Sequence, residues 1–205
     1  MIKVESYSDQ IRRLFPPEQF DSMHINGSHV KSITFQVTED CNLRCSYCYQ
    51  HNKTHNKMTF DVAKRFIDMI LSSDERSNKY ITADKSQGAI IEFIGGEPFL
   101  EIDLIDQITD YFIEQVFLKH HPWANRYRIS ISSNGLLYFD ERVQNYIKKN
   151  FEHLSLGISI DGDKELHDSC RIDANGQGSY DRAMAAVKHY HDTYGVQISS
   201  KMTIA

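Results

Sequence analysis

Three of the four cysteines in the chain lie within eight residues, at Cys41, Cys45 and Cys48. This spacing lets one short loop wrap its thiolates around a small inorganic core. Three thiolates can hold three irons of a 4Fe-4S cluster and leave the fourth iron open for chemistry. The alternative is a structural zinc site, which needs a fourth ligand and has candidates in the nearby His51 and His55.

The composition of the chain limits the class of protein to which these cysteines can belong. With 205 residues, of which 40% are hydrophobic, the chain can bury one substantial core. The formal net charge of −5 is opposite in sign to the basic surfaces that bind nucleic acid or anionic membranes. No apolar run approaches the roughly 18–20 residues that span a bilayer, and the first five residues are too polar for a signal peptide. We therefore expect a cytoplasmic protein with reduced thiols, no nucleic-acid partner and no membrane contact.

The regular part of the chain begins near residue 33. Residues 1–32 show only a short helical pattern near 8–15, so we expect a lead-in segment there. Residues 32–38 are rich in β-branched and aromatic side chains, and the apolar ones alternate with polar ones. This alternation at period two predicts the first β-strand, and the cysteines follow it directly.

Strands alternate with helices along the remaining chain. Apolar runs predict further strands at 89–94, 127–132, 153–160 and 197–204. Apolar side chains at helical spacing predict helices at 60–72, 104–116, around 143–147 and at 179–191. Residues 72–88 are mostly polar and are expected to form a loop. The alternation predicts an α/β fold with parallel strands, and the missing helix after the fifth strand favours an open half-barrel over a closed barrel.

Each of the first four predicted strands runs into a loop with unusual chemistry. The cysteines follow the first strand, and the later loops are Gly95-Gly96-Glu97-Pro98, Ser133-Asn134-Gly135 and Asp161-Gly162. Functional groups of parallel α/β folds collect at the carboxyl edge of the sheet. We therefore expect all four loops to converge on one rim.

Together these motifs resemble the radical S-adenosylmethionine (radical SAM) enzymes. The cysteine spacing, with Tyr47 just before the last cysteine, is similar to the family signature, and Gly95-Gly96-Glu97-Pro98 is similar to its second motif. A later segment resembles the peptide- and protein-modifying subgroup, which includes SPASM-type and sulfatase maturases, at Ser159, Asp161, His167, Asp168 and Arg171. The resemblance implies a partial (β/α)6 TIM-type barrel, truncated after about the fifth strand. Residues 33–205 would form this radical SAM core, incomplete at its C-terminus.

The resemblance also implies cofactors and their contacts. In this family the three cysteines ligate a 4Fe-4S cluster, whose open iron binds SAM, so the implied metal ligands are Cys41, Cys45 and Cys48. Cleavage of SAM, driven by a donor such as flavodoxin or ferredoxin, yields a radical that abstracts hydrogen from the substrate. The implied SAM contacts are Tyr47 at the adenine, Glu97 at the ammonium, Ser159 and Arg171 at the carboxylate and ribose, and Gly95, Gly96, Pro98, Ser133, Asn134 and Asp161 beside them.

The implied substrate is a peptide or protein. Sulfatase-maturing relatives typically carry Gln immediately before the Gly-Gly-Glu-Pro turn, where this chain has Ile94. This difference favours a ribosomal-peptide maturase that forms a thioether or another crosslink. The alternative within the family is an anaerobic sulfatase-maturing enzyme, and the alternative of another class is a zinc-stabilised binding module without catalysis.

Overall fold

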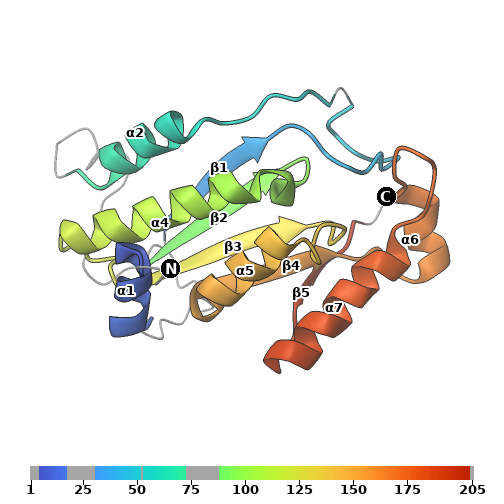
Figure 1. Cartoon of the computed structure of the whole chain (residues 1–205). Coiled ribbons are helices and arrows are strands. Elements are labelled where there is room, and N and C mark those ends of the chain that lie inside the picture. Colours follow the sequence, from blue (N-terminus) through green and yellow to red (C-terminus); the bar gives the residue numbers. More distant parts are fainter. Residues whose placement is uncertain (1–4, 18–30, 52, 73–87, 204–205) are drawn as a thin grey trace.

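One parallel β-sheet carries the chain. The computed structural model describes residues 5–17, 31–51, 53–72 and 88–203. Five strands lie in their order along the chain (Figure 1), and every neighbouring pair is parallel. They are β1 (Lys31–Thr38), β2 (Ala89–Gly95), β3 (Tyr127–Ser133), β4 (Leu154–Ser159) and β5 (Ser199–Lys201).

The sheet is open, with β1 at one edge and β5 at the other. This confirms the predicted α/β fold class, a partial barrel rather than a closed one. The fifth strand is shorter than predicted, because pairing with β4 extends only over Ser199–Lys201. Residues 204–205, at the end of the predicted strand, lie outside the described residues.

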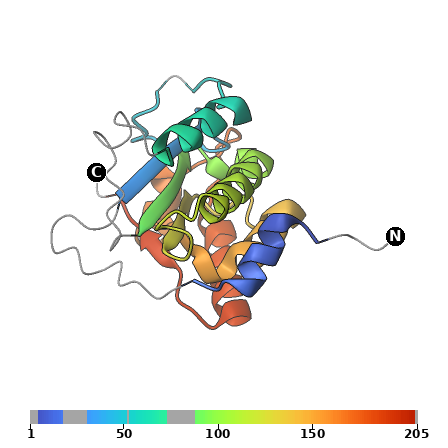
Figure 2. The same cartoon turned by 90° about the vertical axis from the view of Figure 1, so that its left-hand side faces the viewer.

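Helices connect the strands and lie along one face of the sheet (Figures 1 and 2). Parallel pairing of successive strands with crossovers of one hand requires this arrangement. The helices are α1 (Tyr7–Leu14), α2 (Phe60–Ile70), α4 (Ile102–Leu118), α5 (Glu141–Asn150), α6 (Lys164–Cys170) and α7 (Tyr180–Tyr194), with short 3₁₀ turns η1 (Pro98–Glu101) and η2 (Phe151–His153). None of the helices in the described ranges is long and apolar enough to cross a membrane.

Local capping decides where several helices begin. The Thr59 side chain accepts a hydrogen bond from the Val62 N–H, so α2 begins at Phe60 as predicted. It ends at Ile70, two residues before the predicted end. The sequence did not predict α6, because seven residues are too few to show an apolar period; Asp163 caps it.

The predicted loop at 72–88 falls largely outside the described residues.

Alternating strand residues supply the core, as the period-two pattern predicted. The inward side chains of β1 are almost completely buried, and the Phe35 ring stacks on Phe93 of β2 at 5.7 Å between ring centroids. Apolar faces of the helices close this core from the other side. The sheet is therefore a rigid support for the loops at its carboxyl ends.

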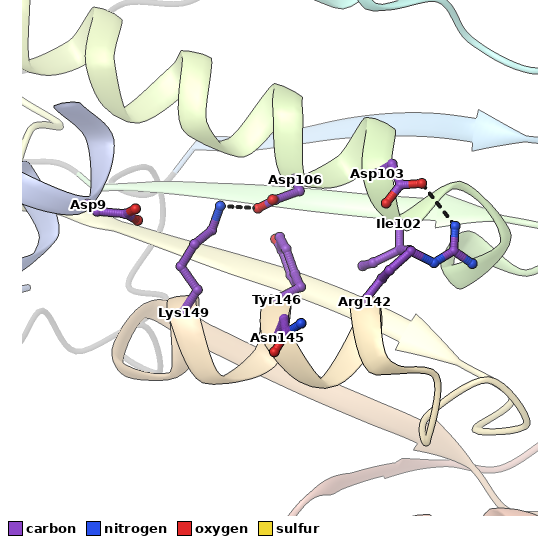
Figure 3. A pocket seen from close by; sticks show the side chains of 8 residues that line it. All are labelled: Asp9, Ile102, Asp103, Asp106, Arg142, Asn145, Tyr146 and Lys149. Atoms are coloured by element: carbon purple, nitrogen blue, oxygen red, sulfur yellow. Dashed lines mark hydrogen bonds and ion pairs between the residues drawn. The ribbon is translucent and has the colours of Figure 1, made fainter. Parts of the chain in front are cut away.

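Ion pairs join the helices to one another. Lys149 of α5 pairs with Asp106 of α4, and Arg142 pairs with Asp103 at 2.9 Å (Figure 3). These side chains border a cavity of about 480 Å³ between the two helices. The cavity belongs to the helical layer and does not include any of the predicted site residues.

The N-terminal helix α1 is found where a short helix was predicted, and it is attached to this layer. Its Ile11 is buried in the core. Arg12 donates to Asn150 Oδ1 of α5 at 3.0 Å and to Asp110 Oδ1 of α4 at 2.6 Å. One largely buried guanidinium therefore connects α1 to two helices of the main body.

We predict that Arg12→Ala lowers the free energy of unfolding by about 1–3 kcal/mol, because it removes charge-assisted bonds that are largely shielded from water. The matched control is Arg13→Ala on the same helix, whose side chain is 61% exposed and pairs with Glu5 at the surface. Urea unfolding of both variants measures the difference. Equal effects of the two substitutions would contradict the attachment of α1 through Arg12.

Candidate functional site

The loop after β1 carries the three cysteines to the rim of the sheet. Cys41 is buried, and Cys45 and Cys48 are half-buried. Two local bonds shape the entry to the loop: Thr38 Oγ1 accepts from the Asp40 N–H at 3.0 Å, and Asp40 Oδ1 accepts from the Cys41 N–H at 2.7 Å. The loop therefore leaves the strand in a defined direction.

A distant segment of the chain holds the other part of this loop. The Arg44 N–H donates to the Ile172 carbonyl at 2.7 Å, and the Ser46 N–H donates to the Cys170 carbonyl at 3.0 Å. Figure 1 shows the loop after β1 reaching the segment that follows α6. The cysteine loop is thus paired with residues 170–173 through the backbone.

Cations surround the cysteines. Arg44 Nη1 donates to the Cys41 carbonyl at 2.5 Å, and Lys53 Nζ donates to the Leu43 carbonyl at 2.6 Å. Burial raises the pKa of the Cys45 thiol, whereas the positive charges of Arg171 and Lys53 oppose that rise. A cavity of about 510 Å³ opens beside Cys45 and Cys48, and its other lining residues are Arg44, Gln50, His51 and Lys53.

The two glycines of the turn after β2 allow the backbone to press against the cysteine loop. A Cβ on Gly96 would lie 2.3 Å from the Asp40 carbonyl oxygen, and one on Gly95 would lie 2.8 Å from that of Thr38. Real Cβ atoms do not come this close to another atom. The two glycines therefore allow the turn after β2 to pack directly on the end of β1 and the start of the cysteine loop.

Glu97 joins two turns at the rim through its carboxylate, which is 1% exposed. Oε1 accepts from Ser133 Oγ at 2.8 Å and from the Phe99 N–H at 3.1 Å, and Oε2 accepts from the Asn134 N–H at 2.8 Å. Burial raises the pKa of Glu97, and these three donors act against that rise. Oε2 keeps capacity for a further donor, because a carboxylate oxygen has two lone pairs.

Asn134 points from the turn after β3 to the cysteines. Its Nδ2 donates to Asn42 Oδ1 at 2.7 Å and contacts Cys41 Sγ at 3.9 Å. The sequence placed Asn134 in a groove for SAM, but it gave no signal of contact with a cysteine sulfur. Such contacts matter, because hydrogen bonds to the sulfurs help set the reduction potential of an iron-sulfur cluster.

Asp161 and Arg171, both buried, meet the half-buried Tyr47 of the cysteine loop. Tyr47 donates its hydroxyl proton to Asp161 Oδ2, and Arg171 Nη1 donates to the Tyr47 hydroxyl. Burial, followed by the bond to Asp161, raises the pKa of Tyr47 to about 12. Arg171 is 8% exposed, and its Nε–H finds no acceptor within the described part of the chain. Ser159 is half-buried at the end of β4.

His167 and Asp168, which belong to the same sequence pattern as Arg171, hold the loop after β4 through hydrogen bonds. His167 is completely buried, its Nδ1 accepts from the Asp161 N–H at 3.2 Å, and its Nε2 lies 2.9 Å from Ser179 Oγ. Asp168 accepts from the Tyr180 N–H at 2.9 Å. Through these bonds both residues shape the loop that carries Arg171.

The donor set fits a cluster better than a single metal ion. Within the residues that the structure describes, no three His, Cys, Asp or Glu side chains gather around one ion position. His55, one of the candidate fourth ligands of a zinc site, is bonded to Asp40 at 2.7 Å. Three thiolates on one loop match the donor set that holds three irons of a 4Fe-4S cluster. The cavity beside Cys45 and Cys48, together with the free Nε–H of Arg171, fits a bound cofactor.

Comparison with known proteins agrees with this geometry. A family model described as the radical SAM superfamily matches residues 35–204. The chain belongs to the radical SAM superfamily. Membership makes it part of a class of enzymes and implies SAM and a 4Fe-4S cluster as cofactors.

The alignments with individual relatives cover most of this chain. It is 33% identical over 170 residues to an uncharacterized protein of Methanocaldococcus jannaschii, covering 82% of this chain and 52% of that protein. It is 32% identical over 164 residues to the cysteine-type anaerobic sulfatase-maturating enzyme of Clostridium novyi, covering 78% and 40%. The radical SAM chain therefore spans about half or less of the length of these relatives.

A solved structure shares the fold. It is described as native anSMEcpe with bound AdoMet and Kp18Cys peptide, and it superimposes with a TM-score of 0.63 at 23% identity. The match covers 83% of this chain and 42% of the other. At this identity the match establishes the shared radical SAM fold, and the partial barrel is the part that the two chains have in common.

We predict that Gly96→Ala lowers the free energy of unfolding by about 1–3 kcal/mol more than Gly157→Ala does, because the added methyl group meets the Asp40 backbone. Gly157, in β4, is the matched control, since a Cβ there would meet only ordinary contacts of 3.6 Å or more. Gly96→Ala should also lower the iron content after anaerobic reconstitution. Urea unfolding and iron analysis test this, and unchanged values for Gly96→Ala would refute the close packing.

Proposed function

We propose that this chain forms the cofactor-binding part of a radical SAM enzyme that modifies a peptide or protein. The observation that carries the proposal is the meeting of the three-cysteine loop with Glu97, whose N–H donates to the Asp40 carbonyl, and with Arg171, which donates to the Tyr47 hydroxyl. Cys41, Cys45 and Cys48 would hold the 4Fe-4S cluster. Residues 33–205 would be the radical SAM core, and residues 1–32 a lead-in that α1 attaches to it.

When bound, the cluster and SAM supply reductive bond cleavage and hydrogen abstraction. The chain orients these groups and excludes water from them. Glu97 keeps acceptor capacity on Oε2 for the SAM ammonium, and Arg171 keeps its Nε–H for the carboxylate or ribose. The remaining proposed SAM contacts are the residues around them: Tyr47, Gly95, Gly96, Pro98, Ser133, Asn134, Ser159 and Asp161.

The substrate is proposed to be a peptide or protein, and the reaction to be a thioether or other crosslink. Ile94 supports the crosslink, because sulfatase-maturing relatives typically have a polar Gln at that position. The second candidate is anaerobic sulfatase maturation, which the 32% identity to the Clostridium novyi enzyme favours. Both reactions need an electron donor such as flavodoxin or ferredoxin, and we place the enzyme in the cytoplasm without a nucleic-acid or membrane partner.

We predict that Cys45→Ala abolishes formation of 5′-deoxyadenosine from SAM under reducing conditions, because one iron loses its ligand. Cys170→Ala is the matched control: Cys170 lies beside the same loop, yet it is outside the three-cysteine motif. It should retain cluster absorption and SAM cleavage. If the Cys45→Ala protein still produced 5′-deoxyadenosine, this loop would not be the cluster site.

The two candidate reactions leave different products. A crosslink joins two residues of one peptide with loss of two hydrogen atoms, whereas sulfatase maturation oxidises a single residue. We predict that the full-length enzyme crosslinks a short precursor peptide encoded beside its gene. Tandem mass spectrometry of that peptide and of a sulfatase-derived peptide distinguishes the two outcomes. Modification of the sulfatase peptide alone would replace the crosslink proposal with sulfatase maturation.

A further inference from the structure

Asp161 is the most heavily engaged side chain at the end of β4. It is 3% exposed, and both of its carboxylate oxygens are occupied by other parts of the chain. Oδ2 accepts from the Tyr47 hydroxyl and lies 3.5 Å from Arg171 Nη1, while Oδ1 accepts from the Thr203 N–H at 2.9 Å. These contacts tie the carboxylate to the cysteine loop through Tyr47 and to the segment after α6 through Arg171.

The three side chains form a directed series of hydrogen bonds. Arg171 donates to the Tyr47 hydroxyl, and that hydroxyl donates in turn to Asp161. Tyr47 lies between Cys45 and Cys48 in the sequence. The series therefore starts at Arg171 after α6, passes through Tyr47 in the middle of the cysteine loop and ends at the Asp161 carboxylate after β4.

The buried positive charge of Arg171 makes the position of this side chain depend on the Asp161 carboxylate. Arg171 is largely buried, and a buried cation that loses its partner is strongly destabilised. Among the described residues, the carboxylate that lies within ion-pair distance of Arg171 is Asp161, at 3.5 Å from Nη1. The contact with Asp161 engages only Nη1, so Nε–H stays available.

We infer that Asp161 is a positioning residue that orients Arg171 and Tyr47 between the cysteine loop and the SAM site. It acts through these two side chains rather than by touching SAM itself. The inference rests on the proposed function and refines it, because it moves Asp161 from the set of direct contacts to the set of residues that support them. The backbone pairing of residues 44 and 46 with 170–173 holds the loop whether or not Asp161 is charged.

The test compares Asp161→Asn, Tyr47→Phe and the double variant with the wild-type enzyme, each reconstituted anaerobically as the full-length protein. Asp163→Asn is the matched control, since Asp163 only caps α6 and Asn caps helices equally well. Three quantities are measured: iron content, the dissociation constant of SAM, and the electron paramagnetic resonance spectrum of the reduced cluster before and after SAM is added.

We predict that Asp161→Asn keeps near-wild-type iron content and weakens SAM binding by about tenfold to a hundredfold, the range expected for loss of a charge-assisted bond. The spectral change on SAM addition should be reduced or altered, which a purely structural role would not cause. Because Asp161 acts through Tyr47, the double variant should bind SAM about as weakly as Asp161→Asn alone. Asp163→Asn should match the wild type in all three measurements.

Other outcomes overturn the inference. Unchanged SAM affinity and spectrum in Asp161→Asn would show that Asp161 does not position the site. Loss of iron in proportion to loss of SAM binding would assign it to the fold instead, and additive effects in the double variant would show that the two residues act independently. If the wild-type protein itself bound no SAM, the proposed function would fail, and the inference with it.

Discussion

The site depends on the burial of one carboxylate. An isolated buried carboxylate is strongly disfavoured, so Glu97 requires donors that compensate for lost water. Phe99, Ser133 and Asn134 provide them, from the turns after β2 and β3. These bonds can form only while the two turns lie side by side. The carboxylate therefore selects one arrangement of the rim, and the other loops are built against it.

The cysteine loop is shaped from both sides before any cofactor binds. On one side, Gly96 lets the turn after β2 press against Asp40, where any side chain would collide. On the other side, residues 170–173 pair with the loop through backbone hydrogen bonds. Arg44 and Lys53 satisfy carbonyls that the curved loop cannot pair within itself. Such preorganisation reduces the entropy that the loop would otherwise lose when it binds a cluster.

Much of the fold could be predicted because its signals are local. Alternation in β1 and apolar spacing in α2 reflect burial on one side of an element, which neighbouring residues reveal. The convergence of four loops follows from parallel pairing alone. Short elements were not predicted correctly. The helix α6 has only seven residues and depends on its Asp163 cap, and β5 is shorter than predicted because its length is set by its pairing with β4.

The sequence by itself determined the chemistry: three thiolates at a spacing for an iron-sulfur cluster, a Gly-Gly-Glu-Pro turn, and the order of motifs that marks the radical SAM superfamily. Only the tertiary structure decided which groups meet. It placed Asn134 against Cys41, enclosed Glu97 among donors, and connected Tyr47, Asp161 and Arg171 in one series. The reason is physical. Side-chain chemistry belongs to each residue, whereas burial and hydrogen-bond partners depend on distant segments that only folding brings together.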